Sequence, residues 1–523
     1  MEMEMEAEME MEMEMEMEME AEAEVQTEAE TEAEVQTEAE TEAEVQTEAE
    51  TEAQAQAEVQ VQVPSLLPKV PLLHIFSFLD ASSLLQAGQV NKHWNKMADD
   101  ENLWRSLCRS RWSGSWEAPQ VPAWKQLFLA QARRELRMAR AQPQDFSYRE
   151  ATGSLGVLGP LAYFSGSDPS ISGQKSIVCA VSSRRVLYAW DVQEGSLTWS
   201  SPAQQANIKY LATLPQRSLA FTVDREETVK VWNCQDAEPL AARSMPRCCF
   251  SLEAFLADDG PVLMVGDSEG DIHTLTVPAL ASVSRVNAFD YSVDLLYCSP
   301  NRKWVFASGI HPHMLPKVFS AQGLLRPGGS APASVSLPFA FCSQACWALK
   351  CANRVTVMFR RASCRRTGFG TFDLTATSPG GRSGLEARQI AAFMLPDEME
   401  DPLRMGVRDG DSIVFESGPH LFLFSIRGHL LHRLSHHQNT ICSLWVDSLH
   451  VLTASMDNYL HLYMWEEEGR GAGLLSCCHL EQRRADPTPS CYYSRAICDS
   501  TSIVCVVSKA REASVLVMYS LGP

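Results

Sequence analysis

The feature that most constrains the fold is a strand-like pattern that recurs from about residue 155 to residue 523. Short runs rich in Val, Leu, Ile and aromatic residues alternate with Gly, Asp, Asn or Pro, as expected for short strands joined by turns. Two closely matching runs are VLYAWD at 186–191 and TVKVWN at 228–233. Large apolar residues stand at equivalent points of eight such runs: Trp190, Trp232, Leu275, Phe319, Phe359, Phe424, Tyr463 and Tyr519.

Most of the spacings between these eight residues are 39–44 residues, which is close to the ~40–45-residue period of a four-stranded propeller blade. Two spacings are longer, and we expect loop insertions there. The first insertion is expected around 375–412, a stretch rich in Gly, Ser, Pro and acidic residues. The pattern therefore predicts a mainly β fold, with a β-propeller of seven or eight blades over residues 151–523.

Residues 64–112 have a helical period instead. Leu72, Ile75, Phe76 and Leu79 fall at i, i+3, i+4 and i+7, so they share one face of a helix. A unit of fewer than about 50 residues with so much aliphatic surface forms a poor core on its own. We therefore expect this unit to bury its apolar face against another protein.

Residues 113–150 join the helical unit to the propeller. Trp124, Leu127 and Phe128 mark one face of an expected helix over 123–141, and a set of arginines marks the polar side. This segment is interpreted as a linker helix.

Residues 1–63 are of low complexity. Met–Glu alternation gives way to the repeat TEAEVQTEAE, and the segment holds 24 Glu without any Lys, Arg or Asp. Glu at nearly every second position leaves no apolar stripe, so we expect a solvated, disordered acidic tail. The rest of the chain has 44 basic and 42 acidic residues. Its near-neutral charge indicates neither nucleic acid nor an anionic membrane as a partner.

The cysteines and the lengths of the apolar runs indicate in which cellular compartment the protein is expected. No run of about 18 apolar residues is present, and the N-terminal residues do not follow the secretory pattern. The 16 cysteines form no Cys-x-x-Cys pair and lie in strand-like runs, as do Cys179, Cys249 and Cys505. This usage predicts reduced, mostly buried thiols. We therefore expect a cytoplasmic or nuclear protein, or one found in both places.

The segment LPKVPLLHIFSFLDASSLLQAGQVNKHWNKMADDENLWRSL at 67–107 resembles an F-box from end to end. The helix that begins at Trp124 resembles the segment after the F-box in WD-repeat members. The chain beyond the tail therefore resembles the F-box/WD-repeat family, the substrate-recognition subunits of Skp1–cullin–F-box ubiquitin ligases. This resemblance implies a WD40-type propeller preceded by a small all-α F-box domain at 64–112.

The resemblance also implies partners. The F-box would dock on a Skp1-type adaptor, which joins a cullin–RING ligase, while the propeller would receive an unknown protein substrate. The residues carried over for adaptor docking are Leu67, Pro68, Ile75, Phe76, Leu79, Leu84 and Trp94. Pro71 departs from the aliphatic residue that is usual in the family. Proline is tolerated only in a first turn, so we expect the helix to start near Val70 or Pro71.

One blade, at 436–465, keeps the family pattern best. His437, Ser455, Asp457 and Tyr463 match its spacing of turn His, strand residue, turn Asp and final aromatic. Because such groups hydrogen-bond one another inside a blade in the family, we interpret them as structural.

Four arginines in RRASCRR form the one dense basic cluster: Arg360, Arg361, Arg365 and Arg366. Such a cluster is a candidate contact for a phosphorylated or otherwise anionic ligand. The alternative is a solvated loop, and the sequence leaves both open.

Two further motifs are weak. His429, His432, His436 and His437 are clustered, but they lie in strand and turn sequence, which favours blade structure over a zinc site. GSDPSISGQKS at 166–176 lacks the glycine spacing of a phosphate-binding loop. We expect no metal, no cofactor and no catalytic residue.

The leading hypothesis is a non-catalytic substrate-recognition adaptor of a ubiquitin ligase. The alternative is a non-degradative interaction scaffold with a degenerate F-box/WD architecture. It is suggested by Pro71 and by the incomplete match of most blades to the WD-repeat pattern. A third hypothesis makes the acidic tail the effector of a nuclear factor.

Overall fold

The computed structural model describes residues 68–112, 123–151, 155–166, 175–326, 332–361, 366–377, 384–466, 473–481, 491–509 and 513–522. The chain divides into two compact units, residues 1–107 and residues 108–523. The predicted acidic tail at 1–63 lies outside the described residues.

The first unit is built from short helices joined by tight turns. They are α2 (Lys69–Phe76), α3 (Ala81–Gln89), α4 (Lys92–Ala98) and the start of α5 (Glu101–Arg111). Asp80 caps α3, because its carboxylate accepts the Ser83 N–H at 2.8 Å. Asn91 caps α4 by accepting the N–H groups of His93 and Trp94, both at 2.9 Å. These side chains satisfy helix-end donors that would otherwise be unpaired.

Aromatic and aliphatic side chains fill the centre of this unit. Phe76 and Leu84 are 2% and 0% exposed, and the Phe76 ring packs edge to face against Trp94. The buried Trp104 donates its indole N–H to the Ala98 carbonyl at 2.7 Å. The unit therefore has a small core of its own.

Pro71 lies in the first turn of α2, as its chemistry requires. The first backbone hydrogen bond of the helix runs from Leu72 N to Pro68 O at 3.2 Å. The N–H groups before Leu72 would have no partner inside the helix in any case. Pro71 therefore costs α2 no hydrogen bond, and the helix starts one residue earlier than expected, at Lys69.

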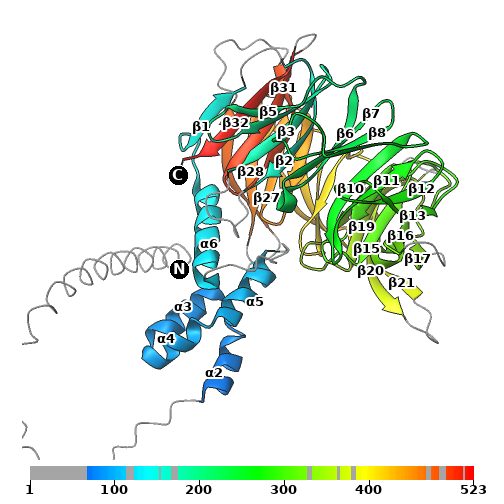
Figure 1. Cartoon of the computed structure of the whole chain (residues 1–523). Coiled ribbons are helices and arrows are strands. Elements are labelled where there is room, and N and C mark those ends of the chain that lie inside the picture. The colour runs from blue at the N-terminus through cyan, green and yellow to red at the C-terminus, as the bar shows by residue number, and fades with distance from the viewer. Residues whose placement is uncertain are drawn as a thin grey trace, which may run out of the picture. The chain divides into compact units, whose positions relative to one another are not determined.

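The second unit contains, in its described residues, eight four-stranded antiparallel sheets. Figure 1 shows these sheets set as blades of a ring. The innermost strands of neighbouring blades pack against one another, and β2 packs against β30 to complete the ring. The protein is thus mainly β with an eight-bladed propeller, which decides between the seven and eight blades that the sequence leaves open.

Blades one to four consist of β2 (Leu158–Ser165), β3 (Ile177–Ser182), β4 (Val186–Asp191) and β5 (Leu197–Ser200); β6 (Ile208–Leu214), β7 (Leu219–Asp224), β8 (Thr228–Trp232) and β9 (Ala241–Ser244); β10 (Cys249–Ala257), β11 (Gly260–Asp267), β12 (Asp271–Thr276) and β13 (Ser282–Asn287); and β14 (Leu295–Cys298), β15 (Trp304–Ser308), β16 (Lys317–Ser320) and β17 (Ser334–Ser336). A 3-10 turn at Pro215–Arg217 follows β6, and α7 (Ala321–Leu324) follows β16.

Blades five to eight consist of β18 (Cys342–Trp347), β19 (Arg354–Arg361), β20 (Arg366–Thr377) and β21 (Gly384–Met394); β22 (Met405–Val407), β23 (Ser412–Ser417), β24 (His420–Ser425) and β25 (Leu430–Leu434); β26 (Ile441–Val446), β27 (His450–Ser455), β28 (Tyr459–Trp465) and β29 (Leu474–Glu481); and β30 (Cys491–Cys498), β31 (Ser502–Lys509), β32 (Val515–Leu521) and β1 (Phe146–Glu150).

The fourth strand of blade eight, β1, precedes all the other propeller strands in the sequence. β1 pairs with β32 in antiparallel register from Phe146↔Leu521 to Glu150↔Val517. This outermost strand lies at the end of the segment 113–150 that is predicted to be the linker. The sequence does not indicate the strand, because a pairing between residues so far apart in the chain leaves no local signal. The last sheet therefore joins both ends of the unit and closes the ring.

The expected linker helix is confirmed as α6 (Trp124–Arg140). Met138 packs into the apolar core of blades seven and eight. Glu135 is also buried, and its carboxylate pairs with Arg111 at 3.0 Å and accepts the Trp112 indole N–H. Burial raises the pKa of Glu135, while Arg111 and Trp112 oppose this rise. A buried carboxylate therefore ties α6 to the end of α5.

Two sequence expectations are wrong in detail. Phe359 lies on β19, the second strand of its blade, and Phe372 on β20 takes the place that Trp232 has on β8. Short apolar runs of second and third strands look alike, which explains the wrong marker.

The stretch around 375–412 is not a loop throughout, because β20 and β21 form a long hairpin there, with pairs from Gly368↔Met394 to Thr377↔Gly384. β21 is an outer strand with exposed positions, so it tolerates the polar composition that suggested a loop.

Candidate functional site

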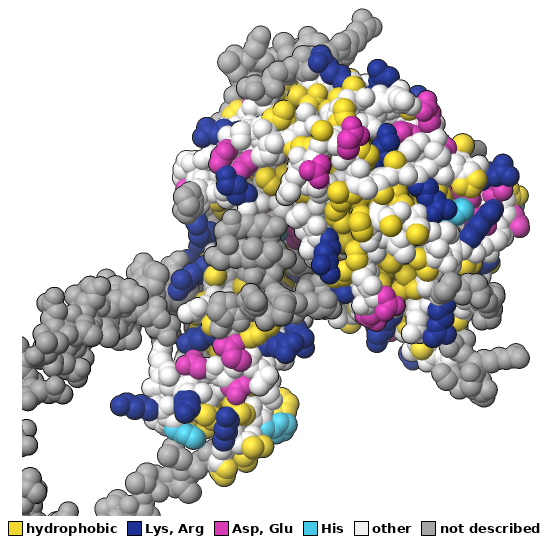
Figure 2. Space-filling model, in the orientation of Figure 1, with side chains coloured by type: hydrophobic (Ala, Val, Ile, Leu, Met, Phe, Trp, Pro, Cys, Tyr) yellow, Lys and Arg dark blue, Asp and Glu magenta, His cyan; other side chains and the backbone are white. Residues whose placement is uncertain are grey.

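The helical unit exposes large apolar side chains beside its small core. Val70 and Phe78 are each 77% exposed, Val90 is 59% exposed and Ile75 is 49% exposed. Figure 2 shows hydrophobic side chains gathered at the end of the unit where α2 lies. Several large apolar groups exposed on so small a unit are typical of a protein-binding surface. We call these four side chains the apolar docking face.

The predicted docking residues do not all lie on this face. Ile75 and Pro68 are exposed, and Leu79 and Trp94 are partly buried. Phe76 and Leu84 are buried inside the unit, so they support the face instead of forming it. Leu67 lies outside the described residues.

Sequence reasoning counted Val90 among the apolar positions of the F-box match but placed neither it nor Val70 nor Phe78 among the docking residues. Val70 and Phe78 fall off the i, i+3, i+4, i+7 stripe that singled out the buried face of α2. For Val70 the usable signal was that KVPLLHIF is apolar on more than one side, since apolar residues outside the buried face of a short helix suggest that a partner covers them.

The basic cluster is mostly paired with nearby carboxylates. Arg360 pairs with Asp401 at 2.6 Å and Arg366 with Asp397 at 2.7 Å. Arg361 is exposed at the end of β19, and Arg365 lies outside the described residues. Two of the four predicted arginines, Arg360 and Arg366, are therefore already paired with carboxylates in the described residues.

A groove of about 430 Å³ lies beside Arg360 and Arg361. The Phe339 and Phe359 rings stack there with centroids 4.0 Å apart, and Phe393 and Met394 from β21 also line it. Arg360 and Arg361 form part of the same lining. The groove therefore offers an apolar floor with positive charge, which suits a protein segment with a bulky apolar residue next to an acidic one.

The best-preserved blade shows the expected internal hydrogen bonds. His437 contacts Asp457 at 3.0 Å through Nδ1 and Thr453 at 2.8 Å through Nε2. Burial lowers the pKa of His437, although Asp457 opposes this. The other three histidines of the sequence cluster are exposed. His437 thus holds the turn of blade seven to its strands, which is a structural task.

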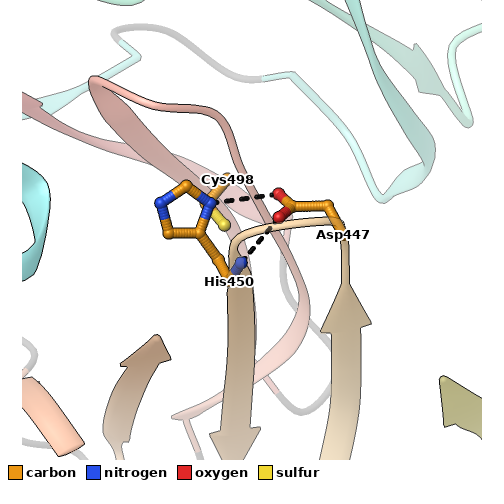
Figure 3. A group of neighbouring side chains, drawn as sticks. All are labelled: Asp447, His450 and Cys498. Atoms are coloured by element: carbon orange, nitrogen blue, oxygen red, sulfur yellow. Dashed lines mark hydrogen bonds and ion pairs between the residues drawn. The ribbon is translucent and has the colours of Figure 1, made fainter. Parts of the chain in front are cut away.

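A second buried histidine stands where blades seven and eight meet. Figure 3 shows Asp447, His450 and Cys498 around one point, with the histidine Nδ1 facing the carboxylate. The Nδ1–Oδ2 distance is 3.2 Å. Burial lowers the pKa of His450, but the charge and hydrogen bond of Asp447, together with the charges of Asp499 and Glu135, outweigh this and raise the pKa. No described helix is long and apolar enough to cross a membrane.

The comparisons with known proteins agree with this architecture. An F-box-like family model matches residues 65–110. F-box/WD repeat-containing protein 12 of Homo sapiens is 50% identical over 461 residues, which cover 87% of this chain and 99% of the relative. F-box/WD repeat-containing protein 15 of Mus musculus is 37% identical over 87% of this chain and 98% of the relative.

Solved structures support the fold alone. The Dos1 propeller matches with a TM-score of 0.50 and 13% identity, over 74% of this chain and 97% of that one. The family is shown instead by the two long relatives and by the position of the F-box-like match. The chain belongs to the F-box/WD repeat-containing proteins.

Proposed function

We propose that this protein is the substrate-recognition adaptor of a Skp1–cullin–F-box ubiquitin ligase. The observation that carries the proposal is the apolar docking face of Val70, Ile75, Phe78 and Val90 on a unit that matches an F-box. In this proposal a Skp1-type adaptor covers the face, and the propeller holds the target protein. The protein would act in the cytoplasm, the nucleus or both.

The energetics favour a partner over a solvated face. Burial of one Val, Ile or Phe side chain contributes about 1.5–3 kcal/mol. Ile75 and Phe78 together therefore supply several kcal/mol if a partner covers them. An aspartate at either position would place a charge in the buried interface, and that is costly unless the charge is paired.

The mechanism is proximity, and the chain itself supplies no catalytic group. A target held on the propeller is kept near the transferring enzyme at a high effective concentration. The groove beside Arg360 and Arg361 is one place on the described propeller that would suit such a target. Arg361→Glu should therefore weaken target capture without changing adaptor capture.

The docking step is tested by co-purification of the full-length chain with Skp1. Ile75→Asp and Phe78→Asp should each lower capture at least about tenfold, and Leu79→Asp and Trp94→Ala should also weaken it. The matched control is Leu403→Asp, because Leu403 is 79% exposed on the propeller. Circular dichroism of each variant monitors folding. Equal capture by wild type and both face variants, or no capture by wild type, would reject the docking assignment.

The alternative of a non-degradative scaffold is tested on the ubiquitinated proteome. One reason for the scaffold alternative is that Pro71 departs from the F-box pattern. This reason is weakened, because Pro71 lies in the first turn of α2 and removes no hydrogen bond. Cells with and without the protein should differ in the ubiquitination of the proteins captured by its propeller. Unchanged ubiquitination alongside normal partner capture would favour the scaffold.

A further inference from the structure

A cluster of three metal-ligating residue types lies where blades seven and eight meet. Asp447 is in the turn between β26 and β27, His450 is the first residue of β27, and Cys498 is the last residue of β30. Each offers one donor atom, and the three atoms lie within 4.8 Å of one another. Figure 3 shows the carboxylate and the imidazole facing each other, with the cysteine beside the ring.

We propose that Asp447, His450 and Cys498 bind one zinc ion, with water as the fourth ligand. The chemistry of the donors selects the metal. Thiolate and imidazole suit zinc, whereas calcium and magnesium prefer oxygen donors alone. The inference is independent of adaptor docking and of target binding.

The separation of the first two donors fits a tetrahedral ion. His450 Nδ1 and Asp447 Oδ2 are 3.2 Å apart. Two ligands that each lie about 2.0 Å from tetrahedral zinc are about 3.3 Å apart. The ion can therefore take the place of the proton between imidazole and carboxylate, and the Cys498 sulfur lies within 4.8 Å of both donor atoms.

The surrounding chain already orients the carboxylate. Asp447 Oδ1 accepts the N–H groups of Leu449 at 2.8 Å and His450 at 2.7 Å. Trp465 donates its indole N–H to the Asp447 carbonyl at 3.1 Å, which fixes the turn. Such outer contacts hold metal ligands in place before the ion arrives.

Burial and charge also suit a divalent cation. His450 and Cys498 are 1% and 2% exposed, while the Asp447 side chain is 28% exposed. Zinc and its water can therefore enter from the Asp447 side. One aspartate, one neutral imidazole and one thiolate give a neutral complex with Zn²⁺. Binding converts the Cys498 thiol to thiolate and releases its proton to solvent. The Nδ1 proton that His450 donates to Asp447 also leaves, to solvent from a doubly protonated ring or to Nε2 in a neutral ring, so the bound imidazole is protonated on Nε2 alone.

A second cluster in the described residues has similar residue types but is already occupied. Asp271 pairs with Arg285 and accepts a hydrogen bond from Asn287, and His273 contacts Asp267 at 2.8 Å. The arginine charge and these contacts leave no open donor set there. His273 is therefore a suitable histidine control.

The test uses the full-length chain, first loaded with zinc and then with cobalt. The folded wild type should carry one zinc per chain by mass spectrometry of metals after dialysis. Cobalt should give a thiolate-to-cobalt charge-transfer band and the intense visible bands of tetrahedral cobalt. Zinc should also raise the melting temperature of the wild type.

Variants assign the ion to the cluster. His450→Gln and Cys498→Ser should lose the zinc and the thiolate band. His273→Gln and Cys342→Ser, at a buried histidine and a buried cysteine of other blades, should keep both. If Cys498→Ser does not fold, the comparison of wild type with His450→Gln decides the question. The absence of bound zinc and of the thiolate band in the folded wild type, or their persistence in His450→Gln, overturns the proposal.

Discussion

Phe76 and Trp94 pack edge to face inside the helical unit, with ring centroids 5.4 Å apart. Ile75, the neighbour of Phe76 on α2, is half exposed. Of these two adjacent residues of one short helix, Phe76 therefore belongs to the core of the unit, and Ile75 belongs to the exposed side chains that we propose dock on a partner. Substitutions can separate these two contributions.

Phe76→Ala should destabilise the helical unit by about 3–5 kcal/mol, because it removes a buried aromatic side chain. Phe78→Ser should change its stability by about 0.5 kcal/mol or less, because Phe78 is 77% exposed. Hydrogen exchange of residues 68–107 in the full chain measures both. Equal protection in the two variants would contradict the assignment of Phe76 to the core.

Thr222→Val should destabilise blade two by about 1–3 kcal/mol. The buried Trp232 donates its indole N–H to Thr222 Oγ1 at 2.9 Å, and valine leaves that donor without an acceptor. Urea unfolding followed by tryptophan fluorescence checks the loss. The control is Thr228→Val, at a partly exposed position at the start of β8.

Gly270→Ala should destabilise blade three by about 2–4 kcal/mol. Gly270 has φ +87°, and an added Cβ would lie 1.9 Å from the Phe289 carbonyl oxygen. Gly260→Ala is the control, because Gly260 also has positive φ but no atom within 4 Å of an added Cβ. Its cost should be about 1 kcal/mol, from the backbone conformation alone. Equal costs in urea unfolding would exclude the steric cause.

Glu253 should make stability depend on pH. Burial raises the pKa of Glu253 from 4.5 to about 7, although its carboxylate accepts the Cys298 N–H at 2.9 Å. Between these two values the folded chain holds a proton that the unfolded chain has released. The free energy of unfolding contributed by Glu253 therefore falls as pH rises through this window and levels off above about pH 7.

Glu253→Gln keeps an acceptor for the Cys298 N–H and removes the titration. Relative to wild type, the variant should gain about 1–3 kcal/mol of stability between pH 5 and pH 8. Urea unfolding at several pH values measures the difference, and all other titrating groups cancel in it. If the difference in free energy of unfolding between Glu253→Gln and wild type does not change with pH, Glu253 is solvated in the folded chain.

The sequence predicts the propeller well because its signals are local. A large buried apolar residue on the third strand, such as Trp190 or Trp232, recurs once per blade and can be counted. The number of blades is harder to predict, since β1 pairs with β32 across nearly the whole unit. Such a pairing depends on ring closure and not on any nearby residue.

The docking face is predicted less well, for a physical reason. A helical stripe identifies residues that share a face, but it does not show whether the unit or a partner covers them. Phe76 and Leu84 are covered by the unit itself, whereas Val70 and Phe78 are not. The zinc ligands are harder still, because Asp447 and Cys498 are brought together only when two blades pack.

The closing strand β1 also bears on how the protein is made. Blade eight needs residues 146–150 to pair with residues 517–521, so the ring cannot close until residues 517–521 have been translated. The helical unit lies wholly before that point and can fold as soon as it leaves the ribosome. A nascent chain would thus present its F-box while the propeller is still open, and β1 would stay without its partner strand until residues 517–521 have been made.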